Sequence, residues 1–292
     1  MTAPSHATLL ALEGVSFRYP DGAIGLDGCS LAIRRGSRNA LIGANGSGKT
    51  TLFQHANGLL RPQSGGVRYA GEAVEYSRSG LRTLRTRVGM VFQNPDQQLF
   101  SASVQEDVSF GPLNLGLDRE TVRERVAAAL QAVGMLRFAD KAVHNLSFGQ
   151  KKRVCIAGVL AMEPELLVLD EPMAGLDHGM QEELLAVLEG LHARGITLLL
   201  STHDIDFAYR WADQIHLMVA GRCAVSLEAP NLADCADDLA AVGLPLPQVI
   251  ALHRQLAASG LLAADRRPRT CAELLTMLKT NDCRKGEPCC VA

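Results

Sequence analysis

The first ninety residues alternate short apolar runs with turns, which is the hydrophobic pattern of β-strands. The predicted strands lie within residues 8–19, 29–33, 39–43, 65–74 and 87–93. A glycine-rich loop follows the third run and leads into a predicted helix over about 49–59. Strand, glycine loop and helix in this order are typical of a mixed α/β protein.

From residue 118 onward, the spacing of apolar residues changes to that of a helix, with apolar side chains at 122, 126, 130 and 133. A second helix is expected to begin near Phe148. Two short, continuously apolar runs at 166–170 and 197–203 then flank an amphipathic segment over 178–195. This is a β-α-β pattern, and runs so apolar favour central strands of a parallel sheet.

The regular pattern of apolar runs ends at about residue 227, and beyond it prolines separate short helical pieces. Thr270 and Glu273 have the spacing of a capping box and predict the start of a last helix. The final dozen residues carry no periodicity and are expected to fray. The sequence therefore predicts one large domain over 1–227 and a small helical extension over 228–292.

Composition and charge exclude several classes of protein. The 292 residues are 47% apolar, enough for a full core, and the net charge of −2 gives no bulk attraction to nucleic acid. No apolar run reaches the roughly 18 to 20 residues that span a bilayer, and the first residues lack the features of a signal peptide. A cytoplasmic protein with reduced cysteines is expected, with Cys29, Cys155 and Cys223 packed in the core.

Residues 43–50, GANGSGKT, fit the phosphate-loop pattern G-x-x-x-x-G-K-[ST], and they lie between a predicted strand and a predicted helix. Glycines let successive N–H groups converge on an anion, and the helix start adds its dipole. Lys49 is expected to neutralise the β- and γ-phosphates, and the Thr50 hydroxyl to bind Mg²⁺. The predicted nucleotide-binding residues here are Gly43, Ala44, Asn45, Gly46, Ser47, Gly48, Lys49, Thr50 and Thr51.

Acidic and polar residues at the ends of three other predicted strands complete a candidate ATPase site. Asp170 ends a buried strand and is expected to hold Mg²⁺, while Glu171 points elsewhere and is placed to polarise an attacking water. Gln93 and His203 also end apolar strands, at the sheet edge where α/β proteins bind ligands, so the Gln93 amide is expected to reach either the metal or the attacking water, and His203 the γ-phosphate. A surface acid at Glu171 and a structural histidine at 203 are the plainer alternatives.

Residues 147–150, SFGQ, stand directly before a basic helix and have no evident partner in their own chain. Together with Tyr19, the phosphate loop, Gln93, LLVLDEP (166–172), AGLD (174–177) and His203, they occur in the order seen in ATP-binding-cassette (ABC) ATPases. The chain resembles that family over about residues 8–225. The resemblance implies a P-loop NTPase with a RecA-like core, an antiparallel β-subdomain, a helical subdomain over about 94–160 and a small C-terminal helical extension.

The resemblance also explains the signature turn, as we call residues 147–150. In this family that turn contacts ATP held by a second subunit, which implies a head-to-tail dimer, here expected to be a homodimer. Mg²⁺-ATP would then be shared by two copies. The resemblance implies further contacts beyond the phosphate loop. Tyr19 would stack on adenine, and Gln93 and Asp170 would join Thr50 on Mg²⁺. On the partner's side, Ser147, Gly149 and Gln150 would contact the phosphate, and Asp177 would couple the two sites.

Three residues depart from the family pattern. Phe148 replaces the usual glycine of the signature turn, and Met173 and Ala174 replace the usual threonine and serine after Glu171. Hydrolysis is expected to survive these changes.

Residues 93–117 resemble the Q-helix region of energy-coupling-factor (ECF) importers, and 146–177 resemble the ATPase of their cobalt and nickel transporters. This implies a peripheral protein on the cytoplasmic face of the membrane, working with a transmembrane coupling protein and substrate-specific membrane components, and not with nucleic acid. Leu99 and Phe100 are apolar in a polar stretch, as expected of a docking element, unless they pack inside the helical subdomain.

Cobalt is the substrate that this resemblance favours, with nickel as the second choice, but vitamin importers of the same group share these motifs. A soluble cassette ATPase acting on DNA is a rival from another class. Such proteins need a coiled coil between phosphate loop and signature, and heptads are absent here. Cys283, Cys289 and Cys290 do not have the spacing of a tetrahedral metal site.

Overall fold

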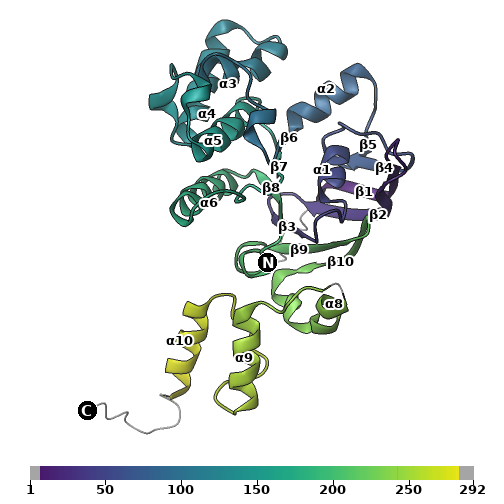
Figure 1. Cartoon of the computed structure of the whole chain (residues 1–292), viewed down its shortest axis with the longest axis vertical. Helices are drawn as coiled ribbons and strands as arrows, with labels where there is room; N and C mark the ends of the chain where they lie inside the picture. Colours follow the sequence, from purple (N-terminus) through teal and green to yellow (C-terminus); the bar gives the residue numbers. More distant parts are fainter. Residues whose placement is uncertain (1–6, 242, 283–292) are drawn as a thin grey trace.

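The computed structural model describes residues 7–241 and 243–282, and Figure 1 shows its layers. An antiparallel sheet has the strand order β2-β1-β4-β5. Its strands are β1 (Thr8–Arg18), β2 (Ile24–Arg34), β4 (Ser64–Tyr69) and β5 (Glu72–Ala73). The single strand predicted within 65–74 was wrong: Ala70 and Gly71 both have positive φ, 49° and 86°, and turn the chain back on itself. The result is a short hairpin.

The second sheet has the order β10-β9-β3-β8-β7-β6, with β10 antiparallel to β9 and the other neighbours parallel. Its strands are β3 (Arg38–Ile42), β6 (Val88–Val91), β7 (Leu166–Leu169), β8 (Thr197–Thr202), β9 (Gln214–Val219) and β10 (Arg222–Glu228). Every residue of β7 and β8 is buried, as their apolar runs predicted. The loops that follow β3, β7 and β8 therefore emerge side by side at one sheet edge.

A helical group lies between β6 and β7 in the sequence and to one side of the parallel sheet in space (Figure 1, teal). It contains η1 (Pro95–Gln97), α3 (Val104–Asn114), α4 (Arg119–Ala132), η2 (Leu136–Phe138), η3 (Val143–Asn145) and α5 (Phe148–Leu160). Helix α4 is the one that apolar spacing predicted, with Asp118 as its N-cap. Helix α5 begins at Phe148, as predicted.

The remaining helices flank the sheets. They are α1 (Lys49–Ala56), α2 (Arg78–Arg87), α6 (His178–Ala193) and α7 (Ile205–Trp211). Helix α2 was not predicted, because its arginine-rich sequence buries just Leu84 and so lacks an apolar stripe.

The C-terminal part, at the bottom of Figure 1, comprises η4 (Ala229–Asp234), α8 (Ala236–Ala241), α9 (Gln248–Ala258) and α10 (Cys271–Asp282). The predicted capping box of α10 is half right. Thr270 accepts from the Glu273 N–H, but the Glu273 carboxylate accepts from Arg269 N instead of Thr270 N. Cys283, Cys289 and Cys290 lie outside the described residues, as does most of the segment expected to fray.

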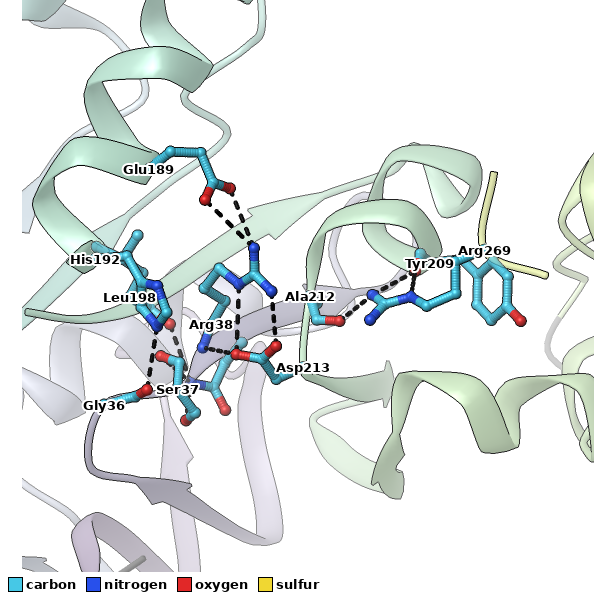
Figure 2. Close-up of polar contacts among 11 residues, drawn as sticks. Gly36, Ser37, Arg38, Glu189, His192, Leu198, Tyr209, Ala212, Asp213 and Arg269 are labelled. Atoms are coloured by element: carbon cyan, nitrogen blue, oxygen red, sulfur yellow. Dashed lines mark hydrogen bonds and ion pairs between the residues drawn. The ribbon is translucent and has the colours of Figure 1, made fainter. Parts of the chain in front are cut away.

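Arg269 attaches this C-terminal part to α7, as Figure 2 shows. Its guanidinium donates to Tyr209 O at 2.7 and 2.9 Å and also to Ala212 O, which are carbonyls at the C-terminal end of α7. Nearby, Arg38 at the start of β3 pairs with Asp213 at 2.8 Å. The helix that follows the His203 loop is thus fixed from both sides. No helix among the described residues is long and apolar enough to cross a membrane.

Candidate nucleotide site

The phosphate loop joins β3 to α1, and its backbone admits no side chain at Gly48. Gly48 has φ +103°, and a Cβ there would lie 2.5 Å from Gly25 O. Lys49 follows with its side chain 6% exposed, and its Nζ donates to Gly43 O at 2.7 Å and Ala44 O at 3.1 Å. The loop therefore surrounds a buried ammonium group with its own carbonyls.

Ser47 lies at the turn of this loop with a buried hydroxyl, which has no hydrogen-bond partner among the described residues. The neighbouring Ala44, Asn45 and Gly46 are exposed. A cavity of about 200 Å³ opens beside residues 43–47 and the end of β9. Free donors, exposed backbone and a helix start at one place fit the phosphates of a nucleotide.

Thr50 and Asp170, which the sequence assigns to Mg²⁺, lie in contact. The Thr50 hydroxyl donates to Asp170 Oδ2 at 2.6 Å, and the other carboxylate oxygen accepts from Ser201 Oγ at 2.6 Å. Asp170 is 5% exposed. A hydroxyl and a carboxylate are oxygen donors of the kind that Mg²⁺ selects, so these residues fit the ion.

Glu171 turns away from Asp170 and towards two nitrogen donors. Its carboxylate oxygens lie 3.9 Å from Lys49 Nζ and 3.5 Å from His203 Nδ1. The backbone of Glu171 has φ +42°, a conformation that is unusual for a residue with a side chain. Its N–H donates to Ser201 Oγ at 2.8 Å. The glutamate side chain is 13% exposed and that of His203 is 73% exposed, so the imidazole faces outward.

Gln93 stands apart from this group. Strand β6 ends at Val91, two residues earlier than predicted, and Gln93 follows it as an exposed residue. Within the described part of the chain its side chain makes no hydrogen bond to Thr50 or Asp170. Its assignment to Mg²⁺ remains a prediction.

Tyr19 lies over the start of α1, where its hydroxyl is 2.9 Å from the Thr51 hydroxyl. Phe17 packs edge-on against its ring, with centroids 5.1 Å apart. Tyr19 and the phosphate loop are therefore neighbours, as adenine stacking requires. The buried Thr51 hydroxyl is engaged by Tyr19, and a nucleotide contact for Thr51 also remains a prediction.

The signature turn forms the start of α5 and satisfies its own polar groups. Ser147 Oγ accepts from Gln150 N at 3.3 Å, and Gln150 Oε1 accepts from Ser147 N at 3.1 Å, which is a capping box. The Gln150 amide, assigned to nucleotide from the resemblance, thus has a structural role. Ser147 Oγ acts as acceptor in this box, so its own hydrogen is available to a ligand.

Asp177 ends the loop after Glu171 and caps α6, with its carboxylate accepting from Met180 N at 2.8 Å. It is exposed. The coupling role that the family resemblance gives to Asp177 is compatible with this position and stays a prediction.

Sequence reasoning missed two residues of the site. Ser201 is fully buried and bonds both Asp170 and the backbone of Glu171. Its signal was a serine directly after the apolar residues 198–200, near the end of a predicted strand. Lys152 is 3% exposed, and its ammonium donates into the loop that follows Glu171. Lys152 is the second of two adjacent lysines in a basic helix, and nothing in the sequence indicates that it is buried.

The phosphate loop, the acidic pair and the signature turn on this two-sheet fold define a P-loop ATPase of the cassette class. Comparison with protein families matches the ABC transporter family over residues 26–174, and the chain belongs to this family. The resemblance stated from sequence is thereby confirmed, as are ATP binding and the ATPase class.

Among its relatives, the energy-coupling factor transporter ATP-binding protein EcfA of Methanocaldococcus jannaschii is 46% identical over 82% of this chain and 86% of its own length. The cobalt import ATP-binding protein CbiO of Rhodobacter capsulatus is 48% identical over 84% of this chain and 87% of its own length. The structure of cbiO1 from Clostridium perfringens, part of an ABC transporter complex, is similar at a TM-score of 0.73 with 42% identity, covering 85% of this chain and 99% of that one.

The ATP-binding cassette MJ0796, a dimer bound to ADP and phosphate, is also similar, with a TM-score of 0.68 and 27% identity over 76% of this chain and 99% of that one. The chain therefore resembles cassettes seen both as part of a transporter and as dimers.

Proposed function

We propose that the chain is the ATP-hydrolysing subunit of an ECF-type importer of transition-metal ions. The observation that carries the proposal is the divided site: the phosphate loop, Asp170 and Glu171 assemble within one chain, while Ser147 and Phe148 of the signature turn are exposed at the start of α5. The likeness to EcfA and CbiO proteins supports the importer type. In this proposal residues 1–227 form the cassette, with a helical subdomain over about 94–160, and 228–292 form its extension.

Two copies would complete each other's sites. Ser147 and the N–H groups at the start of α5 would donate to the γ-phosphate bound by the partner, aided by the helix dipole. The dimeric cassette MJ0796 supports such a pairing. A homodimer is the simplest assembly, because each copy carries both halves of the site.

Within one chain the roles follow from the contacts. Lys49 would leave the carbonyls of Gly43 and Ala44 for the phosphates, and Tyr19 would stack on adenine. Thr50 and Asp170 would hold Mg²⁺, which when bound supplies charge neutralisation at the phosphates. Glu171 would accept a proton from the attacking water, and His203, 3.5 Å from it, would contact the γ-phosphate.

An exposed aromatic pair on the helical group supports docking to a membrane component. Phe100 is 65% and Phe110 51% exposed, and their rings meet edge to face at 4.8 Å. The buried Asp107 accepts from the N–H groups of Phe100 and Ser101 at 2.9 Å each, which turns Phe100 outward. Leu99 instead packs against the core, so the docking expectation is wrong for that residue. The Phe100–Phe110 pair is the proposed contact to a transmembrane coupling protein on the cytoplasmic face.

Cobalt is the proposed substrate, with nickel next, because the cobalt import protein CbiO is among the similar relatives. A vitamin importer is the second candidate, supported by the similarity to EcfA, whose name carries no metal. In either case separate membrane components would select the substrate.

The assignment as an ATPase with a shared site is tested with the variant Glu171→Gln. ATP should shift this variant from monomer to dimer in gel filtration, and steady-state hydrolysis should fall by at least about 100-fold. Glu183→Gln is the matched control, since that carboxylate pairs with Arg153 on the surface and should change neither quantity. A monomeric Glu171→Gln protein with ATP would contradict the shared site.

The assignment as an importer is tested by measuring ⁵⁷Co and ⁶³Ni uptake in source cells that lack the chromosomal gene for this protein. Wild-type protein should restore cobalt uptake, and Phe100→Asp should not, although its ATPase activity in solution is retained. Restored vitamin uptake without metal uptake would favour the second candidate. If neither uptake depends on the protein, the importer assignment is wrong.

A further inference from the structure

Lys152, on the second turn of α5, reaches from the signature helix into the loop that carries Glu171. Its Nζ donates to Pro172 O at 2.7 Å, to Ala174 O at 2.7 Å and to Glu171 O at 3.2 Å. An ammonium group has three hydrogens, so all of its donors are used on this one loop. The residue is 3% exposed, which leaves water little part in holding it.

The loop over residues 171–177 also packs directly on the signature turn. The ring of Phe148 lies against Gly175, where an added Cβ would be 3.1 Å from Phe148 Cε1. The same ring has Lys152 Nζ 5.3 Å from its centroid, in the geometry of a cation–π contact. Gly149 is equally close to α6, with an added Cβ at 3.0 Å from Met180 Sδ. The signature helix is therefore joined to the loop by polar and aromatic contacts, and to α6 by an apolar one.

Placing a lysine here has an energetic cost. Burial lowers the pKa of Lys152 to about 8, while the negative charge of Glu171 on the loop acts in the opposite direction. An apolar side chain would fill such a space without that desolvation, but it could not hold three carbonyls in fixed positions. The three hydrogen bonds of Lys152 thus fix the conformation of the loop, which an apolar side chain of similar size would not do.

We propose that Lys152 is a positioning residue, which locks the 171–177 loop to the signature turn of the same chain. When that turn binds ATP on the second copy, Lys152 would carry the movement to Glu171, so that docking at one site aligns the base of the other. Phe148, in the position where the family usually has glycine, would strengthen the same lock. This inference rests on the proposed function, because it requires the shared site.

The test compares Lys152→Met, Lys152→Arg and Lys151→Met. Lys151 is the matched control, since it is the adjacent lysine on α5 and forms an ion pair with Asp96 at 2.7 Å, away from the loop. The measurements are steady-state ATP hydrolysis by the full chain, binding of a fluorescent ATP analogue, and ATP-dependent dimer formation in the Glu171→Gln background.

Lys152→Met should lower kcat by about 10- to 100-fold, the scale expected from a small misplacement of a reacting group, with analogue binding within about twofold of wild type. Lys152→Arg keeps the charge and donors and should recover most of the rate, and Lys151→Met should behave as wild type. Unchanged kcat in Lys152→Met, or an arginine variant as slow as the methionine one, would overturn the proposal.

Phe148→Ala provides a second route if Lys152→Met does not fold, because that side chain is 40% exposed. It should lower kcat with analogue binding retained, because it removes the ring that packs against Gly175 of the same loop. Unchanged kcat in Phe148→Ala would overturn the proposal. If wild-type protein neither hydrolyses ATP nor, as Glu171→Gln, dimerises, the proposed function has failed instead.

Discussion

The phosphate-loop half of the site and the signature half satisfy their polar groups in opposite ways. In the first, Lys49 and Asp170 are buried, and both of them and Thr50 hydrogen-bond with another group of the nucleotide site. In the second, Ser147 is exposed, and within the described residues its side chain bonds to its own helix start. Buried polar groups must find partners within the chain, whereas exposed ones can await a second molecule.

This difference predicts which property each half controls. Changes in the phosphate-loop half should alter nucleotide binding by the single chain and its stability. Changes in the exposed residues of the signature half should leave nucleotide binding nearly intact and alter the rate, which in the proposed dimer depends on two copies.

The largest effect is expected for Lys49→Met. Removing a buried ammonium that would pair with phosphate should weaken ATP binding by about 100-fold or more, as for truncated charge pairs elsewhere. Titration with a fluorescent ATP analogue measures this. Ser147→Ala should bind the analogue within about twofold of wild type, and an equal loss in both variants would remove the distinction between the halves.

Acid should destabilise the phosphate-loop half through His216 on β9. This fully buried imidazole lies 3.3 Å from Asn39 Oδ1 on β3 and 2.9 Å from Ser226 Oγ, and burial lowers its pKa from 6.5 to about 3. Below pH 6.5 the unfolded chain therefore takes up a proton that the folded chain refuses, so stability falls as pH drops towards 3. By pH 5 the loss from this residue is about 2 kcal/mol.

Urea unfolding of wild type and His216→Asn at pH 7 and pH 5 isolates this contribution, since the asparagine variant lacks it. In the signature half, Lys152 is protonated in both states over this range, and burial raises the pKa of the Cys155 thiol. Neither adds an acid dependence. The same pH dependence in wild type and His216→Asn would show that other groups dominate.

Ser147→Ala should lower kcat by about tenfold, because in the proposed dimer one donor to the partner's phosphate is lost while the backbone donors remain. The variant also loses its N-cap, at about 1 kcal/mol of stability. Ser147→Thr keeps the hydroxyl and the cap and should retain most of the activity. A threonine variant as slow as the alanine one would point to the cap geometry and not to the donor.

The smallest effect is expected for Phe148→Gly, which restores the usual family residue. Loss of the ring's contacts with Gly175 removes about 0.5 to 1 kcal/mol of packing and should lower kcat by about three- to fivefold. Steady-state hydrolysis at saturating ATP measures this change. A faster glycine variant would show that the ring hinders the loop and does not support it.

Sequence alone placed the candidate site residues correctly in the fold, because a phosphate-binding motif requires a loop between a strand and a helix. The loop at 43–50, Asp170, Glu171 and His203 all lie where strand order and the motif predicted, and α5 begins at Phe148. Helix α2 was missed because Leu84 is its one buried residue, so its sequence shows no apolar stripe.

Long-range contacts were beyond sequence reasoning. Ser201 and Lys152 act through partners 30 and about 20 residues away, and their roles follow from which loops emerge next to one another. Likewise, nothing in residues 228–269 foretold that Arg269 would bind the carbonyls at the end of α7. Such pairings depend on tertiary packing, which no local pattern encodes.

Strands β6 and β7 are neighbours in the sheet, although the whole helical group lies between them in the sequence. The chain leaves the sheet after one strand and returns on the next, so the group behaves as an insert into a single crossover. Helix α5 contacts the loop after β7 through Lys152, but the outer surfaces of α3 and α4 can differ without changing the ends of β3, β7 and β8. In the proposed importer, the same ATPase core could then work with different membrane components through that outer surface alone.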